Sequence, residues 1–300
     1  MNTLEVVITS YNQKEMILEA LQSVLNQTQL PNRVVIVDDG SSDLESNMVI
    51  NEIIRNNINH KYPIEVAIKQ QKNHGVSYAR NKGIQLTDSE YVLVLDGDDT
   101  LHPNYIKKVL PKLIENDHIV AASSYLKTFG VLNSIVKPIG GDIENFLCRN
   151  ASPATCIIRK SSYLKSKKYD TKMKTGFEDW DFFISLLETD NHSLISIVEE
   201  PLINYRTNPS SSNINSMKKR VENIQYIVHK HLRTYKKNVE ILVYMYEKMS
   251  YGRLLDTEEE ILHEIRCQND LSKNAKQFLK EPSYGDAGMA SAVRIKSKMK

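Results

Sequence analysis

The chain has 300 residues, of which 41% are hydrophobic and 25% are charged, and this composition is typical of a globular protein with a substantial core. A formal net charge of +2 gives no indication of a nucleic-acid-binding protein. We expect neither a signal peptide nor a membrane-spanning segment, because the amino terminus has no basic segment before an apolar run and no stretch has the roughly 18 apolar residues that a span requires.

In the first third of the chain, predicted strands alternate with predicted helices. Runs of β-branched and other apolar residues predict strands at 4–9, 33–37, 64–69 and 91–95. Helical spacing predicts helices at 17–25 and 44–56, a helix that ends at Gly83, and a further helix at 104–113. This alternation predicts an α/β fold with a mostly parallel sheet and helices on both of its faces.

Polar clusters follow three of these strands, at residues 9–12, 38–43 and 96–99. Ligands of such sheets bind beyond the carboxyl ends of the strands, so three clusters on one edge favour a binding site over unrelated turns. The third cluster contains three carboxylates, which repel one another unless a cation lies among them. Mg²⁺ or Mn²⁺ shared with phosphate groups would meet this need. Taken alone, the cluster is explained equally well by a solvated acidic turn.

Beyond residue 103 the alternation is less regular. We expect strands at 118–126, 154–159 and 193–198, a short helix at 142–148 and an ordered polar loop at 205–212. An amphipathic helix is expected at 177–187, with Glu178 and Asp179 in its first turn. The helix macrodipole favours acids at this position, so a structural reason for the two carboxylates has about the same weight as a functional one.

From residue 214 onward the pattern is nearly all helical, with helices expected at 221–235, 239–249, 258–267 and 271–279. We therefore expect an α/β domain at 1–213, a helical C-terminal region at 214–280 and a flexible tail at 281–300. The apolar stripes of the helical region exceed what one small domain could bury. We hypothesise that this region packs on the α/β domain and also forms a homo-oligomer.

Charge and cysteine content bear on where the protein acts. Residues 217–300 contain 17 Lys and Arg against 11 Asp and Glu, and this basic excess permits peripheral contact with a membrane. A solvated basic face is the simpler explanation. Three widely spaced cysteines without a Cys-x-x-Cys pair indicate reduced thiols. We expect a cytoplasmic protein, with any membrane contact at the inner face of the cell membrane.

Five motifs occur in order between residues 3 and 212. They are VITSYN at 7–12, VDDGSSD at 37–43, NHGVSYARNKG at 73–83, LDGDD at 95–99 and ED at 178–179. Each motif is weak alone, but the series resembles the bacterial family 2 glycosyltransferases. The resemblance implies the GT-A fold, with a nucleotide-sugar half at about 1–102 and an acceptor half at about 103–213. The C-terminal helices lie outside it.

The resemblance also implies a site for a UDP-sugar. Thr9 and Tyr11 would line the base and ribose pocket, and Asp39 would accept a hydrogen bond from the uracil ring. Arg80 would approach the diphosphate. Turn formation by Asp39 and a solvated position for Arg80 are the structural alternatives.

The LDGDD motif would contact both the ribose and the cation. By the resemblance, Asp96 with Gly97 would contact the donor ribose, and Asp98 would bind the Mn²⁺ or Mg²⁺ that bridges the two phosphates. Asp99 is an alternative ligand, and the sequence does not decide between the two acids. The metal would neutralise the charge that develops on the departing nucleoside diphosphate.

The catalytic residues implied by the resemblance lie in the second half of the domain. Asp179 would act as the general base in a single displacement that inverts the anomeric configuration, and Glu178 would support it or contact the acceptor. Arg206 would contact the diphosphate. Asn208 stands where many members of the family have a histidine, so Arg206 is the better candidate for that contact.

The resemblance therefore predicts an inverting, metal-dependent transfer of a hexose or N-acetylhexosamine from a UDP-sugar to a hydroxyl of a saccharide acceptor. A cell-surface polysaccharide, a lipid-linked glycan and a glycosylated adhesin are all open as acceptors, and the donor sugar is open as well. The alternatives are a catalytically inactive nucleotide-sugar-binding protein and, with less support, a sugar nucleotidyltransferase.

Overall fold

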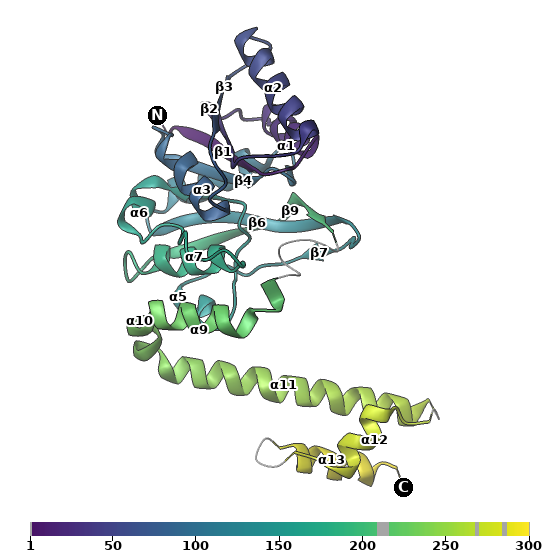
Figure 1. The fold of residues 1–300 in the computed structure, drawn as a ribbon. Helices are drawn as coiled ribbons and strands as arrows, with labels where there is room; N and C mark the ends of the chain where they lie inside the picture. The colour runs from purple at the N-terminus through teal and green to yellow at the C-terminus, as the bar shows by residue number, and fades with distance from the viewer. Residues whose placement is uncertain (1, 209–215, 268–269, 284–286, 300) are drawn as a thin grey trace. The chain divides into compact units, whose positions relative to one another are not determined.

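The computed structural model of the chain describes residues 2–208, 216–267, 270–283 and 287–299 (Figure 1). The chain divides into two compact units, residues 1–235 and residues 236–300, which are treated separately. The first unit contains the sheet and all five motifs of the sequence. The regular elements in the described residues of the second unit are helices.

The sheet is built around strand β1, Leu4–Ser10, which pairs in parallel with β2, Arg33–Asp38, and with β4, Tyr91–Asp96. Strand β3, Glu65–Gln70, continues the parallel arrangement beside β2. In the register of these strands, Thr9 faces Val37 on one side and Asp96 on the other. The carboxyl ends of β1, β2 and β4 therefore meet at one edge, as expected from the positions of the polar clusters.

The remaining strands make the sheet a mixed one. They are β5, Thr100–Leu101; β6, Ile119–Gly130; β7, Ile135–Val136; β8, Cys156–Arg159; and β9, Leu194–Thr207. In the described residues the strand order is β3-β2-β1-β4-β8-β6-β9-β5, with β7 paired to β6. The parallel order holds in the first half, whereas β8 runs antiparallel to both β4 and β6. The predicted α/β fold of the GT-A type is confirmed.

Strand β9 is longer than the predicted strand at 193–198 and includes Tyr205, Arg206 and Thr207, for which a loop was expected. It runs parallel to β6 with register shifts: Ser124 pairs with Val198, and the next residue, Tyr125, pairs with Pro201. Leu126 then pairs with Ile203, so three residues of β9, Glu199, Glu200 and Leu202, are accommodated as irregularities. Pairing with β6 extends the strand through a polar sequence that shows no apolar alternation.

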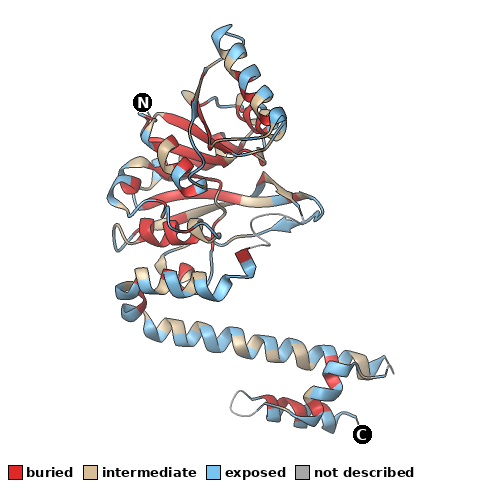
Figure 2. Ribbon diagram, in the orientation of Figure 1, coloured by how far each residue is buried: buried red, intermediate tan, exposed pale blue. Residues whose placement is uncertain are grey.

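Helices cover both faces of the sheet, as predicted. Val6, Ile8, Val34 and Ile36 pack in one core with buried residues of α1, Met16–Leu25, and α2, Leu44–Ile58. Alternate residues of a strand point to opposite faces, so Val7 and Val37 face the other side. There they meet α3, Val76–Gln85, which approaches so closely that a Cβ at Gly83 would lie 2.2 Å from Val7 Cγ1. Figure 2 shows the resulting buried strands between more exposed helices.

Residues beyond β5 contribute further helices, most of them in the first unit. They are α4, Tyr105–Glu115; α5, Ile143–Phe146; α6, Lys160–Lys165; α7, Glu178–Leu187; α9, Arg220–Lys230; and α10, Leu232–Lys237. Helix α7 is the most buried of them, and it carries Trp180, Phe182 and Phe183 into the core. Helix α9 and most of α10 belong to the first unit, so this unit extends beyond the boundary expected at residue 213.

The second unit consists of α11, Val239–Arg266; α12, Lys273–Lys280; and α13, Gly288–Ser297. One continuous helix replaces the two expected at 239–249 and 258–267, because the helix-forming residues around Gly252 outweigh the roughly 1 kcal/mol cost of an interior glycine. Helix α13 lies within the expected flexible tail, and it is ordered because Ala292 and Ile295 pack in a small core with Ile261 and Leu279. In the described residues no helix is both long and apolar enough to cross a membrane.

Candidate active site

The LDGDD motif forms a tight turn at the end of β4, against the end of β1. The backbone N–H of Gly97 donates to the carbonyl of Thr9 at 2.9 Å. A Cβ at residue 97 would lie 2.2 Å from Oε1 of Gln13 and 2.7 Å from the carbonyl oxygen of Thr9. Only glycine fits there, and its absence of a side chain brings the following carboxylates close to β1. Thr9 also donates from its hydroxyl to Asp96 at 3.3 Å.

Arg80 is buried beneath this turn and joins two parts of the site. Its Nη2 donates to both carboxylate oxygens of Asp96, at 2.8 and 2.9 Å, and its Nη1 donates to Glu178 at 2.9 Å. Its guanidinium also lies over the ring of Tyr169, 5.4 Å from the centroid. Burial opposes the charge of Arg80, but the carboxylates of Asp96 and Glu178 raise its pKa well above the usual value. The side chain is neither solvated nor directed at an open phosphate site.

Asp98 and Asp99 differ in their surroundings. Asp99 is buried and accepts a hydrogen bond from the backbone N–H of Arg206 at 2.8 Å. Asp98 is half-buried, and its backbone carbonyl accepts from Nε of Arg206 at 3.0 Å. Burial and the charge of Asp96 raise the pKa of Asp98 to about 6, while burial and the charge of Asp98 raise the pKa of Asp99 well above its usual value. When all three acids of the turn are ionised, their charge exceeds that of Arg80 and Arg206 by one unit.

This excess of carboxylate suits the predicted cation. In the described part of the chain, no three His, Cys, Asp or Glu side chains are grouped so that they could hold a metal ion by themselves. Mg²⁺ commonly takes only one or two protein carboxylates and completes its shell with phosphate oxygens and water. Asp98 fits this role because its carboxylate is partly accessible, and because the ionised carboxylate is unfavourable there without a cation beside it. Asp99 fits it less well, since one of its oxygens is occupied by the Arg206 N–H.

Helix α7 begins with a strained turn that presents Glu178 and Asp179. Gly176 has φ +92°, and Phe177, which precedes the helix, has φ +67°. The left-handed conformation is rare for an aromatic residue and is found mainly where function or packing requires it. Trp180 anchors the turn, because its indole N–H donates to the carbonyl of Phe146 at 2.6 Å in the core. That bond supports an anchoring role for Trp180.

Asp179, in the first turn of α7, has a raised pKa. One of its oxygens accepts from Nδ2 of Asn150 at 2.8 Å, and the other accepts from the backbone N–H of Trp180 at 2.8 Å. Burial and the neighbouring charge of Glu178 raise its pKa to about 7, although Arg80 acts in the opposite direction. A carboxylate with this pKa can both accept and release a proton near neutral pH.

The remaining residues predicted for the donor pocket occupy different environments. Thr9 is buried at the end of β1, whereas Tyr11 is 47% exposed. The carboxylate of Asp39 is buried and accepts from Nε2 of Gln71 at 2.7 Å and from the backbone N–H groups of His74 and Gly75 at 3.0 and 2.7 Å. Asp39 therefore fixes the loop before α3.

In the VDDGSSD motif, Asp38 makes the turn contact that was considered above for Asp39. Asp38 accepts from the hydroxyl of Ser41 at 2.5 Å.

Two residues near these acids were not predicted. Asn150 contacts Asp179 from a segment without a recognisable motif. Tyr205 lies at the end of β9, where burial and the charges of Asp99, Asp96, Asp98 and Asp179 raise the pKa of its hydroxyl. Tyr205 is next to Arg206 in the sequence, but we expected a loop there. In the strand that forms instead, adjacent side chains point to different faces, and a loop gives no indication of this.

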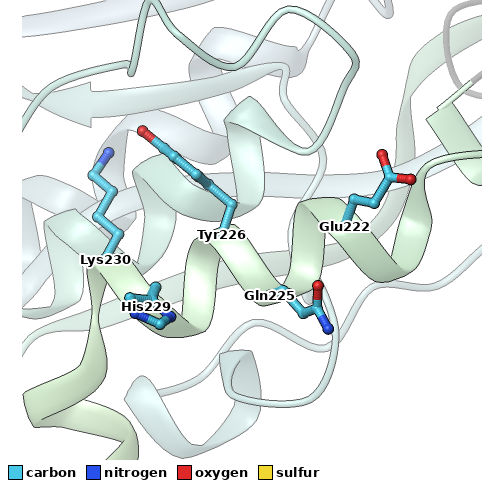
Figure 3. Close-up of a pocket in the computed structure, with 5 residues that line it drawn as sticks. All are labelled: Glu222, Gln225, Tyr226, His229 and Lys230. Carbon is cyan, nitrogen blue, oxygen red and sulfur yellow. The ribbon is translucent and has the colours of Figure 1, made fainter.

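A surface hollow lies elsewhere, along α9. It has a volume of about 610 Å³ and is lined by Glu222, Gln225, Tyr226, His229 and Lys230 (Figure 3). Tyr226 and Lys230 both contact Asp170, at 3.0 and 2.8 Å. None of the five belongs to the five sequence motifs, and the hollow does not include the acidic turn.

Comparison with known proteins assigns the chain to a family. Residues 5–178, which are 174 of the 300 residues, match Glycosyl transferase family 2. The chain belongs to this family. The match includes the turn at Asp96–Asp99 and ends at Glu178. The protein is therefore a family 2 glycosyltransferase, as the five motifs indicated.

Relatives of this glycosyltransferase support the assignment. An uncharacterised glycosyltransferase of Haemophilus influenzae is 29% identical over 75% of this chain and 74% of its own length. Another, from Methanocaldococcus jannaschii, is 26% identical over 82% of this chain and 85% of its own length. The crystal structure of S. aureus TarS 1-349 superposes with a TM-score of 0.53 at 23% identity, over 68% of this chain and 60% of that structure, and so shares the fold.

Proposed function

We propose that this glycosyltransferase transfers a hexose or N-acetylhexosamine from a UDP-sugar to a hydroxyl of a saccharide acceptor, with inversion at the anomeric carbon. The observation that carries the proposal is the link through Arg80, which joins Asp96 of the donor half to Glu178, the neighbour of Asp179. A structure of S. aureus TarS in complex with UDP-GlcNAc has the same fold, with a TM-score of 0.54 at 20% identity. This similarity supports a UDP-sugar as the donor.

In the proposed donor complex, the ends of β1, β2 and β4 hold the nucleotide. Thr9 and Tyr11 flank the base and ribose, and Asp39 takes the uracil N–H in place of one of its loop contacts. Asp96, fixed by Arg80 at 2.8 Å, accepts a hydrogen bond from the ribose, with Gly97 beside it. Arg206 lies next to the acidic turn and offers its guanidinium to the diphosphate. Arg80 acts indirectly, by holding the acids in position.

Asp98 is the residue that we propose as ligand for Mn²⁺ or Mg²⁺, with Asp99 supporting the turn. When bound, such an ion neutralises the charge that develops on the leaving diphosphate. In the protein itself the carboxylate of Asp98 remains partly accessible, whereas the carboxylate of Asp99 accepts a hydrogen bond from the backbone N–H of Arg206. The raised pKa of Asp98 is consistent with a carboxylate placed for a cation.

The reaction we propose is a single displacement. Asp179 accepts the proton of the acceptor hydroxyl, and the hydroxyl oxygen forms a bond to the anomeric carbon. The bond between that carbon and the β-phosphate oxygen breaks, and UDP leaves with the bonding electron pair. Asn150 holds one oxygen of Asp179 at 2.8 Å and so orients the carboxylate. General base catalysis of this kind contributes about 10²- to 10⁴-fold.

The test is UDP release from a panel of UDP-sugars, with and without Mn²⁺ and with saccharide acceptors. Donor-dependent UDP release that rises with an acceptor supports the proposal. Asp179→Asn should abolish transfer and keep UDP binding, and Asp117→Asn, a change at a highly exposed carboxylate, is the matched control. Nucleotide-sugar binding without turnover under any condition would instead favour an inactive binding protein. Pyrophosphate-dependent formation of a nucleoside triphosphate would favour a nucleotidyltransferase.

We further propose that the acceptor belongs to a cell-surface polysaccharide, a lipid-linked glycan or a glycosylated adhesin, and that the second unit mediates self-association in the cytoplasm. Helix α11 exposes Val243, Tyr244 and Tyr246, which favours contact with another copy. The mass in solution of the full chain and of a chain that ends at Tyr235 tests this. An unchanged oligomeric state would count against the association.

A further inference from the structure

A hairpin at the end of β6 carries a group of exposed aliphatic side chains. The chain leaves β6 at Gly130, turns, and returns through β7 to Gly140 (Figure 1). Between these glycines lie five large aliphatic residues that are 43% to 71% exposed: Val131, Leu132, Ile135, Val136 and Ile139. Figure 2 shows this end of β6 and β7 as exposed. A cluster of this kind on a small projection is a common mark of an interaction site.

Hydrogen bonds hold the hairpin in this exposed form. The backbone N–H of Leu132 donates to the hydroxyl of Thr207 at 2.9 Å, and that of Val131 donates to the carbonyl of Thr207 at 3.3 Å. Across the hairpin, the N–H of Thr128 donates to the carbonyl of Ser134 at 2.8 Å, and the N–H of Ser134 donates to the hydroxyl of Thr128 at 2.8 Å. These hydrogen bonds fix the backbone of the hairpin, so its aliphatic side chains are exposed in a defined conformation.

Two glycines fix where the hairpin begins and ends. Gly130 has φ +92°, and a Cβ there would lie 2.5 Å from the carbonyl oxygen of Thr207. Gly140 has φ +61°, and a Cβ there would lie 2.4 Å from the carbonyl oxygen of Ile195. Both ends of the hairpin are thus pressed against β9, which favours a single projecting conformation.

The charges of the hairpin have one sign. Between Asp117 and Asp142 the sequence contains no acidic residue, and its charged side chains are Lys127 and Lys137. Both lysines are exposed, and the Lys137 amino group lies 5.9 Å from the centroid of the Tyr125 ring. Aliphatic residues flanked by lysines match a surface that is apolar inside and anionic outside.

We infer that this hairpin docks the enzyme on an anionic phospholipid bilayer. The aliphatic residues enter the interface between headgroups and acyl chains, and Lys127 and Lys137 pair with lipid phosphates. Neither signal alone gives stable attachment, but the two together do. The contact lies near the site, because Thr207 bonds the hairpin and directly follows Arg206, which contacts the acidic turn. Docking would bring the acceptor side of the enzyme to a membrane-bound saccharide.

The test uses the full chain and vesicles of phosphatidylcholine, with or without 30 to 40% phosphatidylglycerol. We expect sedimentation with the anionic vesicles and little with the neutral ones. The triple variant Val131→Ser, Leu132→Ser, Ile135→Ser should lose at least fivefold of the bound fraction. The matched control is Leu44→Ser, Met48→Ser, Ile58→Ser on α2, where the replaced residues are 61% to 75% exposed, and it should bind as the parent does.

Three outcomes would overturn the inference. The parent chain could fail to bind anionic vesicles, the hairpin variant could bind as well as the control, or the hairpin variant could alter only the mass in solution, which would assign the surface to a second copy. UDP-sugar hydrolysis is expected to be equal in parent and hairpin variant, so failure of the docking idea is distinguishable from failure of the proposed function.

A fluorescence measurement covers the case in which the triple variant does not fold. Trp180 is the single tryptophan of the sequence and is buried. Val131→Trp should therefore add emission that shifts to shorter wavelength when anionic vesicles are added, whereas Leu44→Trp should add emission that does not shift. Equal behaviour of the two variants would contradict the inference.

Discussion

Nη1 of Arg80 lies 2.9 Å from Oε1 of Glu178, and this ion pair joins α3 to the first turn of α7. The other amino group of the same guanidinium binds Asp96. Arg80 therefore contacts the LDGDD motif and the ED motif together. Breaking a buried ion pair by removing one partner costs about 3–5 kcal/mol, because the remaining charges are left without compensation.

We expect Arg80→Met to impair both donor binding and turnover. The variant leaves Asp96 and Glu178 unpaired, so the two halves of the site lose their common anchor. Arg80→Lys should be only partly active, since an ammonium group cannot bind both carboxylates through the planar fork of a guanidinium. UDP binding by calorimetry and kcat with an active acceptor measure the effect. A kcat for Arg80→Met that equals the parent's would contradict it.

The second prediction concerns pH. Asp179 must be ionised to accept a proton, and its pKa is raised to about 7 by burial and by Glu178. We expect kcat/KM to fall as the pH decreases through about 7 and to level off above about pH 8. Removing the like charge with Glu178→Gln should lower the pKa of Asp179 and move this limb of the profile to lower pH. If the acidic limb of the kcat/KM profile does not move in Glu178→Gln, a group other than Asp179 causes the pH dependence.

The third prediction distinguishes the two acids of the turn. Asp98→Asn should weaken UDP binding at least tenfold with Mn²⁺ present and leave it nearly unchanged, or improved, without the metal, because the variant removes both a ligand and a repelling charge. Asp99→Asn should have a small effect, since an amide oxygen can still accept from the Arg206 N–H. Calorimetry with and without Mn²⁺ measures both variants. Equal losses would mean that the two acids share the cation.

The fourth prediction concerns the contribution of His231 to the stability of the fold. His231 is buried, with Nε2 3.1 Å from Asp181 and Nδ1 2.9 Å from Glu188. Burial opposes its charge, but hydrogen bonds to Asp181 and Glu188 raise the pKa of His231. Burial acts against ionised Glu188 as well, yet hydrogen bonds from His231 and Thr234 lower its pKa to about 2. Lys167 and Lys230 are the other charged groups that face this cluster.

The direction of the effect follows from these shifts. His231 stabilises the fold fully below its unfolded pKa of about 6.5, and this stabilisation is lost as the pH rises through the higher folded value. Glu188 contributes above about pH 4.5, and its contribution is lost as the pH falls toward 2. We expect His231→Gln to lower the free energy of unfolding by about 3–5 kcal/mol at pH 5.5 and by less at pH 9. Urea denaturation measures it, with exposed His229→Gln as the control.

The sequence predicted the first half of the fold better than the second. Buried strands of β-branched residues and clear turns located β1 to β4, and the positions of their carboxyl ends followed from the parallel order. Strand β9 was assigned too short because the exposed Glu199, Glu200 and Pro201 interrupt it and the buried Leu202 and Ile203 are adjacent, so the segment shows no apolar alternation. The helix at 288–297 was missed for a similar reason, as its stability depends on contacts with Ile261 and Leu279.

For the site, the motifs located the acids but not their partners. Asp98 and Asp179 were assigned from the resemblance to the family 2 glycosyltransferases, and their roles remain predictions. The sequence presented Arg80 as a residue near phosphate, whereas the fold pairs it with Asp96 and Glu178 across 16 and 98 residues of chain. Asn150 has no motif around it. Contacts of this kind are set by the packing of distant segments, and a single sequence carries no signal for them.

The three extra residues in β9 have a consequence for the divergence of this family. Side chains along a strand alternate in direction, so an insertion of one residue between Val198 and Arg206 that no bulge absorbs would turn the guanidinium away from the acidic turn and bring Tyr205 round in its place. A change of two residues would keep Arg206 facing inward while sliding it by about 6–7 Å. Homologues that retain this arginine should therefore differ in length here by even numbers.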